Sequence, residues 1–281
     1  METLFLEPYT ILLIAGFIGF FMAFGIGAND VANSMGTSVG SKAITIKQAI
    51  IIAAIFEFLG AFLAGGEVTS TIRKGIVDPQ LYVDETNIFV IGMLSALLAG
   101  GTWLYVASLR GWPVSTTHTI VGSIIGFVLI TKGVDAVSWG KVGNIAMSWV
   151  TSPLFSGTLA FGIYISAKKL ILDRSNPGEA AITFIPFYSF LVAAVISLVT
   201  ARKGLKHVGV EFSDNEVYLF IAIFSSLVGL ATAFFLRRNK QQIMREGGIE
   251  FAFGLLMIVS ASAMAFAHGS NDVANAIGPL A

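Results

Sequence analysis

Eight long apolar segments constrain what this chain can fold into more than any other feature. They cover about residues 9–27, 49–65, 88–109, 114–130, 137–172, 182–201, 217–236 and 249–267. A helix needs roughly 20 residues to cross about 30 Å of hydrocarbon, and lipid offers no hydrogen-bond partners to an irregular backbone. The sequence therefore predicts an all-α, multi-span integral protein of the cell membrane, surrounded by the lipid bilayer.

The composition excludes other classes of protein. Only 12% of the residues are charged, against about 25% in soluble domains, and the mean hydropathy is +0.81. The 17 basic and 17 acidic residues cancel, which argues against nucleic acid as a partner. Cysteine is absent, so disulfides and thiolate metal sites are excluded. Glu2 and Glu7 precede the first apolar segment without any Lys or Arg, so we expect no cleaved signal peptide.

An internal repeat is the most informative motif. Residues 22–33 read MAFGIGANDVAN and residues 264–275 read MAFAHGSNDVAN, at a constant offset of 242 positions. Nine of the twelve positions are identical. A shared lipid-facing composition explains the Met, Ala and Phe residues, but not the Asn-Asp pair and the second Asn. Paired repeats are typical of secondary transporters.

We expect the two repeats to be inverted. If residues 88–109 and 114–130 form a helical hairpin, and residues 137–172 cross once with a kink at Pro153, an odd number of crossings separates the motifs. Two independent crossings around Pro153 would reverse this inference. The loops assigned to the inside hold nine basic residues and those outside hold seven, which weakly favours an outer N-terminus.

The first motif places polar groups at membrane depth. Asp30 lies in an apolar segment, where a carboxylate is costly unless it is paired, and Asn29 and Asn33 share one helical face. Gly25 and Gly27 lead us to expect a broken helix just before this cluster. The alternative is that the Asn side chains only cap a helix. Glu57 is a second acid within an apolar segment, and we expect it to face the protein interior as a cation ligand, a proton carrier or a structural partner.

The second cluster is GWPVSTTH at residues 111–118, before the apolar segment that starts near Thr119. Pro followed by Ser115, Thr116 and Thr117 gathers free backbone N–H groups and hydroxyl donors at a helix start, which is an oxyanion site. An ordinary N-cap at the membrane surface is the alternative. His118 and His268 lack the spacing of a metal site, and His268 is expected only to cap a helix.

The charges predict a coupled mechanism. If Asp30 and Asp272 converge on a site that also takes an anion, about three to four negative charges meet in a medium of low dielectric constant. Arg110 is the nearest basic residue outside the apolar segments. Small cations must therefore enter with the anion. Oxygen ligands suit sodium ions, while protonation of the carboxylates would serve the same purpose.

The motifs resemble those of the inorganic phosphate transporter (PiT) family. GANDVANS at 27–34, GSNDVANA at 269–276 and PVSTTH at 113–118 carry the resemblance, which runs from about residue 10 to the end. It implies symport of inorganic phosphate with sodium ions, or with protons in some bacterial members, by alternating access through inverted repeats. It further implies two sets of site residues. Phosphate would bind Ser115, Thr116, Thr117, Asn29, Asp30, Asn271 and Asp272, and sodium would bind Asp30, Asn33, Asp272, Asn275 and Glu57.

The repeats divide the chain into three parts. Residues 1–172 form the first repeat, with the signature motif at 25–34 and the hairpin motif at 111–118. Residues 173–248 hold connecting transmembrane helices, and residues 249–281 begin the second repeat, with its motif at 267–276. The second repeat stops six residues after Asn275, before any counterpart of Glu57 or of residues 113–118. We therefore expect a fragment of a longer protein.

Other functions stay open at this stage. The nearest alternative is a permease of the same fold that carries phosphate with protons, a metal phosphate complex, or sulfate. A membrane phosphohydrolase using Asp30 and His118 lacks a metal-ligand set and an activated nucleophile, so we expect no enzyme and no cofactor. A channel would show flux that needs no cation gradient. The expected partners are phosphate, sodium ions and lipid, and a homo-oligomer is left open.

Overall fold

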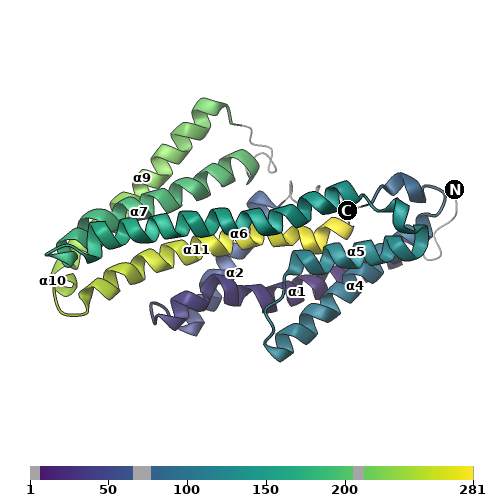
Figure 1. Cartoon of the computed structure of the whole chain (residues 1–281), viewed down its shortest axis with the longest axis horizontal. Coiled ribbons are helices and arrows are strands. Elements are labelled where there is room, and N and C mark those ends of the chain that lie inside the picture. Colours follow the sequence, from purple (N-terminus) through teal and green to yellow (C-terminus); the bar gives the residue numbers. More distant parts are fainter. Residues whose placement is uncertain (1–6, 66–76, 205–211, 281) are drawn as a thin grey trace. The chain divides into compact units, whose positions relative to one another are not determined.

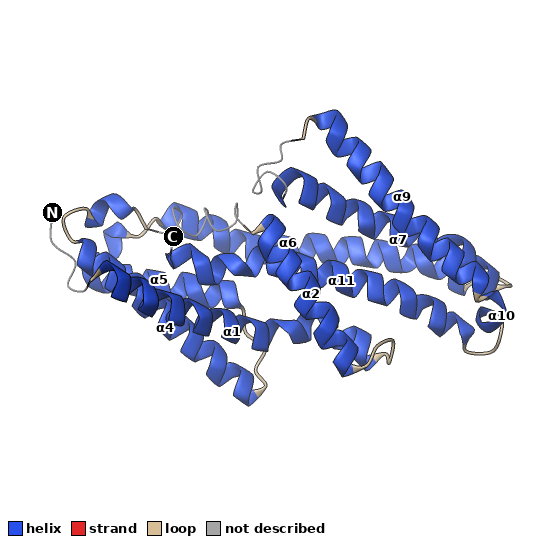
Figure 2. Cartoon of the chain, turned by 180° about the vertical axis from the view of Figure 1, so that it is seen from behind, coloured by secondary structure: helices blue, strands red, loops and turns tan. Residues whose placement is uncertain are grey.

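Helices make up nearly all of the described chain (Figures 1 and 2). The computed structural model describes residues 7–65, 77–204 and 212–280. The long helices are α1 (Pro8–Gly40), α2 (Ile46–Ala64), α4 (Thr86–Arg110), α5 (Thr116–Lys132), α6 (Trp139–Ala167), α7 (Pro177–Val199), α9 (Asp214–Arg238) and α11 (Gly248–Ile277). Within these residues, 7 helical segments are long and apolar enough to cross a membrane, and α5 is a shorter apolar helix. The predicted all-α, multi-span fold class is confirmed.

The chain divides into two compact units. Unit 1 combines residues 1–33, 59–145 and 268–281, and unit 2 combines residues 34–58 and 146–267. Helices α1, α2 and α11 each contribute one part to each unit. This grouping by contact does not follow the predicted order of repeats along the chain. The repeat boundaries and their inverted relation therefore stay predictions.

The helical hairpin predicted from the sequence is present in unit 1, where α4 packs against α5. Met22 of α1, Leu97 and Leu104 of α4, and Ile120 of α5 are fully buried in one apolar core. The helices come close because glycine faces the neighbouring helix: a Cβ atom at Gly101 would lie 2.8 Å from the Phe21 ring. Small residues allow such contact between membrane helices, where packing replaces the hydrophobic effect.

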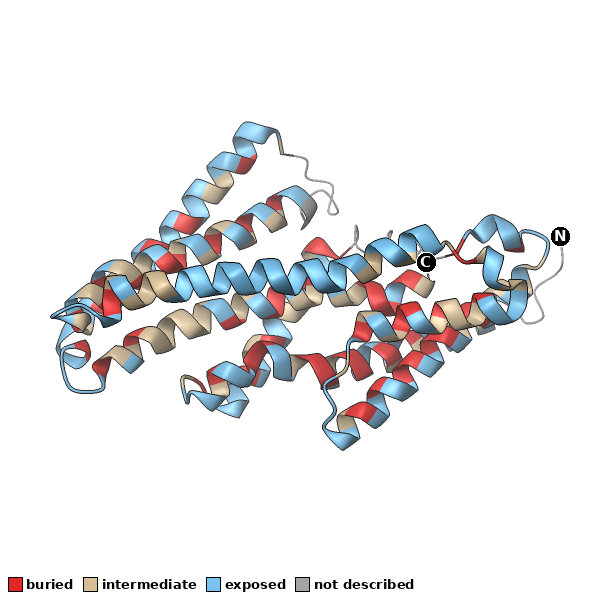
Figure 3. Ribbon diagram, in the orientation of Figure 1, coloured by how far each residue is buried: buried red, intermediate tan, exposed pale blue. Residues whose placement is uncertain are grey.

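Unit 2 contains a second core between α7 and α9. Ile171, Ile185 and Leu236 are fully buried there. In contrast, no residue of α6 is buried, and this helix is exposed along almost its whole length in Figure 3. Pro153 lies inside α6 without ending it, and a turn of π-helix at Lys168–Leu172 follows directly. Residues 137–172 therefore contain one spanning segment, as predicted, rather than two.

The prediction of a broken first helix in each repeat is wrong. Helix α1 continues through Gly25, Gly27 and Asp30, and α11 continues through the second motif. A helix retains its own hydrogen bonds at glycine, and within lipid no other partner competes for them. Gly25 instead serves packing, because a Cβ atom there would lie 3.1 Å from the Leu104 Cβ.

Candidate functional site

In the first motif, Asp30 lies on the buried side of α1. Asn29 and Asp30 are each 8% exposed, whereas Asn33 is exposed. The Asn33 amide donates a hydrogen bond of 3.3 Å to Asp30 Oδ1, and the Thr116 side chain also makes a polar contact with the Asp30 carboxylate. A buried carboxylate needs such donors, because leaving its oxygens without partners in an apolar interior is costly. Asp30 is therefore held between its own helix and the start of α5.

Asn29 fastens the hairpin turn to α1. Its amide group donates to the Trp112 carbonyl oxygen (3.1 Å) and to Ser108 Oγ (3.4 Å), and its Oδ1 accepts from the Val114 N–H (3.3 Å). These contacts use both the donor and the acceptor capacity of the side chain. The sequence predicts phosphate binding here, but the geometry gives Asn29 a positioning contact with the turn that ends in Ser115.

The hairpin turn delivers a helix N-terminus, as the sequence predicts. Gly111 ends α4 in the left-handed conformation, with φ at 66°. Ser115 is the N-cap of α5, where its hydroxyl accepts a 3.2 Å hydrogen bond from the His118 N–H. Glycine suits the left-handed position and serine the N-cap. The free N–H groups and the positive end of the helix dipole therefore lie at Thr116 and Thr117.

The three hydroxyl residues do not share one environment. Thr116 is buried, and the Asn275 amide donates to its hydroxyl (3.2 Å) and to that of Thr117 (3.3 Å). Ser115, with His118 and Thr119, lines a pocket of about 560 Å³ beside α5, and neither Thr116 nor Thr117 lines that pocket. The structure thus separates Ser115 from the other two residues of the predicted oxyanion site.

The second motif reaches the hairpin through Asn275, which is only 1% exposed. Besides Thr116 and Thr117, its amide group donates to Asp272 Oδ1 at 3.3 Å. One amide group has two hydrogens and here faces three acceptor oxygens. A series of polar contacts therefore runs from Asp30 through Thr116 and Asn275 to Asp272, and joins the two motifs across the start of α5.

The second motif is also anchored to the end of α2. Ser270, 3% exposed, donates to the Ala64 carbonyl oxygen at 3.1 Å. Gly65 leaves room for Val273, because a Cβ atom there would overlap the Val273 side chain. These contacts fix the position of the helix that carries Asp272 and Asn275.

Comparison with known proteins now identifies the chain. A model described as the phosphate transporter family matches residues 26–281. This chain belongs to the phosphate transporter family. It is 53% identical over 274 residues to a Haemophilus influenzae protein named "Putative phosphate permease", covering 95% of this chain and 64% of that protein. It is 40% identical over 286 residues to "Inorganic phosphate transporter 2-1, chloroplastic" of Arabidopsis thaliana, covering 94% of this chain and 48% of the relative.

A solved structure has a closely similar fold. It is described as "The sodium-dependent phosphate transporter" and matches with a TM-score of 0.87 at 39% identity, over 97% of this chain and 66% of that chain. The chain thus spans about two thirds or less of the length of these relatives. With its spanning helices and this family membership, it is a multi-pass integral membrane protein.

His268 belongs to the surroundings of Asp30, which the sequence alone did not indicate. The two side chains interact electrostatically, and the buried Nδ1 of His268 has no hydrogen-bond partner among the described residues. The expected helix-capping role is not what the contacts indicate. One signal existed in the sequence: His268 occupies the repeat position that Ile26 holds in the first copy.

Two other predicted site residues are not brought into this series of contacts. Asn271 is exposed, and its side chain takes no part in the hydrogen bonds described above. Glu57 lies on α2 within unit 2, so it is described apart from the cluster in unit 1. Among the described residues, no group of three His, Asp or Glu side chains forms a ready metal site.

Proposed function

We propose that this chain carries the substrate-binding part of a secondary active transporter that moves inorganic phosphate across the membrane with sodium ions by alternating access. The observation that carries the proposal is the series of polar contacts from Asp30 through Thr116 and Asn275 to Asp272. Membership of the phosphate transporter family supports the choice of substrate, and similarity to a sodium-dependent phosphate transporter supports the choice of coupling ion.

Phosphate would bind at the start of α5. The hydroxyls of Thr116 and Thr117 can donate to its oxygens, together with the backbone N–H groups of the first helical turn. Ser115 would act as the cap that keeps this turn in place, and Asn29 as the side chain that holds the turn against α1. Asn271 stays a candidate for contact with the phosphate from the exposed side of α11.

Sodium ions would neutralise the charge that phosphate adds. Asp30 and Asp272 already bring two carboxylates to the series, and a phosphate anion raises the total to about three to four negative charges at low dielectric constant. Carboxylate and amide oxygens are hard ligands for a small cation. Asp30, Asp272, Asn33 and Asn275 offer such oxygens, and Glu57 is proposed as a further sodium ligand in the transport cycle.

Alternating access would use the two related motifs. In this proposal residues 1–172 supply the first repeat and residues 249–281 the start of an inverted second repeat, joined by the helices of residues 173–248. Transporters built from such repeats bind substrate near the middle of the membrane and expose the site to either side in turn. Contact of both motifs with one hairpin supports a shared site.

The experiment is uptake of labelled phosphate into proteoliposomes containing this chain. An inward sodium gradient, an inward proton gradient and no gradient are compared. Saturable uptake that requires sodium is the expected result. Asp30→Asn should abolish it, while Asp173→Asn, which changes an exposed carboxylate paired with Lys168, serves as the matched control. Equal uptake with and without gradients would contradict symport and indicate a channel.

Proton coupling is the second candidate, because His268 interacts with the Asp30 carboxylate and both groups can take up protons. Uptake driven by protons alone would keep the site and reassign these residues as proton carriers. Competition by sulfate, or dependence on divalent metal, would identify a different cargo. Release of phosphate from an ester by the purified protein would contradict the proposal that the chain is not an enzyme.

A further inference from the structure

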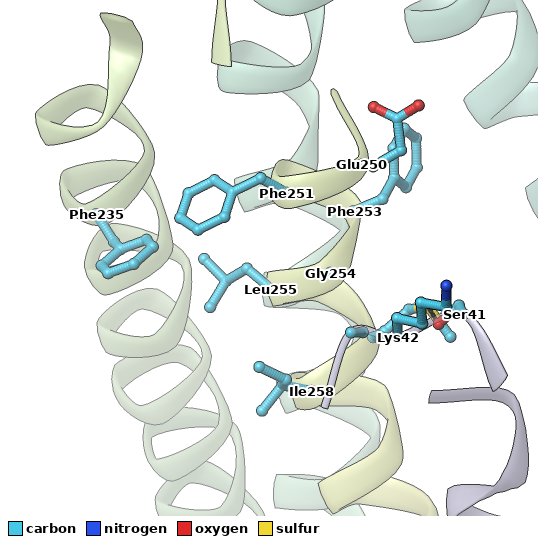
Figure 4. Close-up of a pocket in the computed structure, with 11 residues that line it drawn as sticks. Ser41, Lys42, Phe235, Glu250, Phe251, Phe253, Gly254, Leu255 and Ile258 are labelled. Carbon is cyan, nitrogen blue, oxygen red and sulfur yellow. Dashed lines mark hydrogen bonds between the residues drawn. The ribbon is translucent and has the colours of Figure 1, made fainter. Parts of the chain in front are cut away.

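A pocket of about 420 Å³ lies in unit 2, outside the site described above. It is bordered by the segment that follows α1, the end of α9 and the first turns of α11. Its wall is largely apolar, with Phe235, Phe251, Leu255 and Ile258 as the main side chains (Figure 4). The rings of Phe235 and Phe251 stack with centroids 5.9 Å apart. A pocket of this kind, at the end of membrane helices, suits part of an acyl chain.

Two charged residues complete the lining. Lys42 follows α1, and Glu250 lies in the first turn of α11. Figure 4 draws both on one side of α11, with Phe235 and Leu255 on its other side. Within the described chain, neither side chain makes an ion pair or a hydrogen bond to another residue. The pocket therefore offers one free positive and one free negative group beside an apolar wall.

The backbone at Lys42 is unusual. Its φ is 62°, which makes it the one residue other than glycine with positive φ among the described residues. It occupies the left-handed position after α1, closed by hydrogen bonds from the Lys42 N–H to the Val39 carbonyl and from the Ala43 N–H to the Ser38 carbonyl, both 3.0 Å. Glycine normally fills this position, because a Cβ atom is strained there. A lysine in this place sets the direction of its Cα–Cβ bond at a cost in stability, and its side chain lines the pocket, which points to a use for the ammonium group.

We propose that this pocket binds phosphatidylethanolamine from the surrounding bilayer. One acyl chain would lie along Phe235, Phe251 and Leu255. The lipid phosphate would pair with the Lys42 ammonium, and the primary ammonium of the headgroup would donate to the Glu250 carboxylate. This assignment uses both free charges and the apolar wall at once.

The same chemistry disfavours the other common headgroups. Phosphatidylcholine carries a trimethylated nitrogen without N–H donors, so it cannot donate a hydrogen bond to Glu250. Phosphatidylglycerol has the phosphate for Lys42 but no cation, so Glu250 would face a net negative lipid. Ethanolamine is thus distinguished by a charge-assisted hydrogen bond that the other two headgroups cannot make.

The test is native mass spectrometry of the purified chain with equal amounts of the three lipids. We expect ethanolamine lipid to be retained roughly ten-fold or more over the other two, the ratio that one charge-assisted hydrogen bond supplies. Lys42→Gly should reduce the retention of the ethanolamine lipid to about the level that phosphatidylcholine shows on the unmodified chain. Because glycine relieves the left-handed strain, the melting temperature of this variant should stay level or rise, which separates loss of lipid from loss of fold. Lys47→Ala, which removes a nearby exposed charge outside the pocket, is the matched control and should retain the lipid.

The acidic group is tested separately. Glu250→Gln should remove the preference over phosphatidylglycerol, and Glu250→Lys should reverse it. Equal retention of the three lipids by the unmodified chain would show only annular lipid and overturn the proposal. So would unchanged retention in Lys42→Gly. Because no arm uses phosphate transport or sodium, failure here leaves the proposed function untouched.

Discussion

The two copies of the Asn-Asp motif have nearly the same sequence but different contacts. In the first copy the leading Asn29 is buried and fastens the hairpin turn, while Asn33 is exposed. In the second copy the leading Asn271 is exposed and the trailing Asn275 is buried against the start of α5. Both copies meet the α4–α5 hairpin, and one hairpin cannot offer the same partners to both. A sequence repeat therefore specifies which side chains are available, while the neighbouring helix decides which of them become anchors.

The largest difference between the two copies is expected in phosphate uptake when Asp30 or Asp272 is replaced. Asp30→Asn should lower sodium-dependent phosphate uptake by roughly 100-fold or more, and Asp272→Asn by roughly 10-fold, because Asp30 is the more deeply buried of the two proposed ligands. Both asparagines can still accept hydrogen bonds, so the melting temperature should change little. Uptake into proteoliposomes and thermal unfolding are the measurements. Equal losses would show that the two copies act symmetrically and would break the comparison.

The next largest difference is expected between the trailing asparagines, Asn275 and Asn33, in the free energy of unfolding that each contributes. Asn275→Ala leaves Thr116 and Thr117 without their donor in a buried place, so we expect a loss of about 2–3 kcal/mol in the free energy of unfolding. Uptake should fall with it. Asn33→Ala removes one partly buried hydrogen bond to Asp30, whose carboxylate keeps its contact with Thr116, and should cost about 1–2 kcal/mol, less than Asn275→Ala. A larger loss of stability in Asn33→Ala would contradict the contacts described for the two helices.

For the leading asparagines we expect the opposite order: replacing Asn29 in the first copy should cost more stability than replacing Asn271 in the second. Asn29→Ala removes three hydrogen bonds to the hairpin turn and should cost about 1–3 kcal/mol, whereas Asn271→Ala should stay within about 0.5 kcal/mol. Chemical denaturation in detergent would measure both. If Asn271→Ala abolishes uptake while stability is unchanged, the exposed asparagine touches substrate directly, which would sharpen the assignment of phosphate ligands.

The smallest effect is expected where the copies differ in sequence, at Ile26 and His268. A protonated His268 would add positive charge beside Asp30 and compete with a cation, so sodium affinity should weaken as the pH falls. His268→Gln should flatten this dependence by a few-fold between about pH 5.5 and 8. Ile26→Leu should leave it unchanged. The sodium dependence of uptake at each pH is the measurement, and an unchanged profile in His268→Gln would remove the histidine from the coupling.

Much of the fold could be predicted from hydropathy alone. The segments at 88–109 and 114–130 correspond closely to α4 and α5, and the segment at 137–172 to one long helix, because lipid leaves the backbone little choice. The prediction of a helix break at Gly25 and Gly27 was wrong for the same reason, because within lipid the helix keeps its own backbone hydrogen bonds. Glycine is permissive in isolation, but here its missing side chain is used to let Leu104 approach. The sequence could not reveal that α4 would take this place.

Some residues of the connected cluster could be predicted from the sequence, but their connections could not. Asp30, Thr116 and Asn275 stand out because polar side chains are rare in apolar segments. Their mutual contacts, the anchoring role of Asn29 and the proximity of His268 depend on which helix faces which, and no local pattern encodes that. Ser115 shows the limit clearly: adjacent hydroxyls on a helix point in different directions, so neighbours in sequence need not share a site.

The shared amide of Asn275 has one further consequence. With two hydrogens for three oxygens, the amide can bond fully to only two of them at once, so more than one pairing is open to it. Such degeneracy is a store of conformational entropy. In the proposed function, a sodium ion that coordinates one of these oxygens would select a single pairing, so the first ion to bind would bear the ordering cost for the next ligand. Binding order and cooperativity can then follow from a missing hydrogen, without any large movement of the backbone.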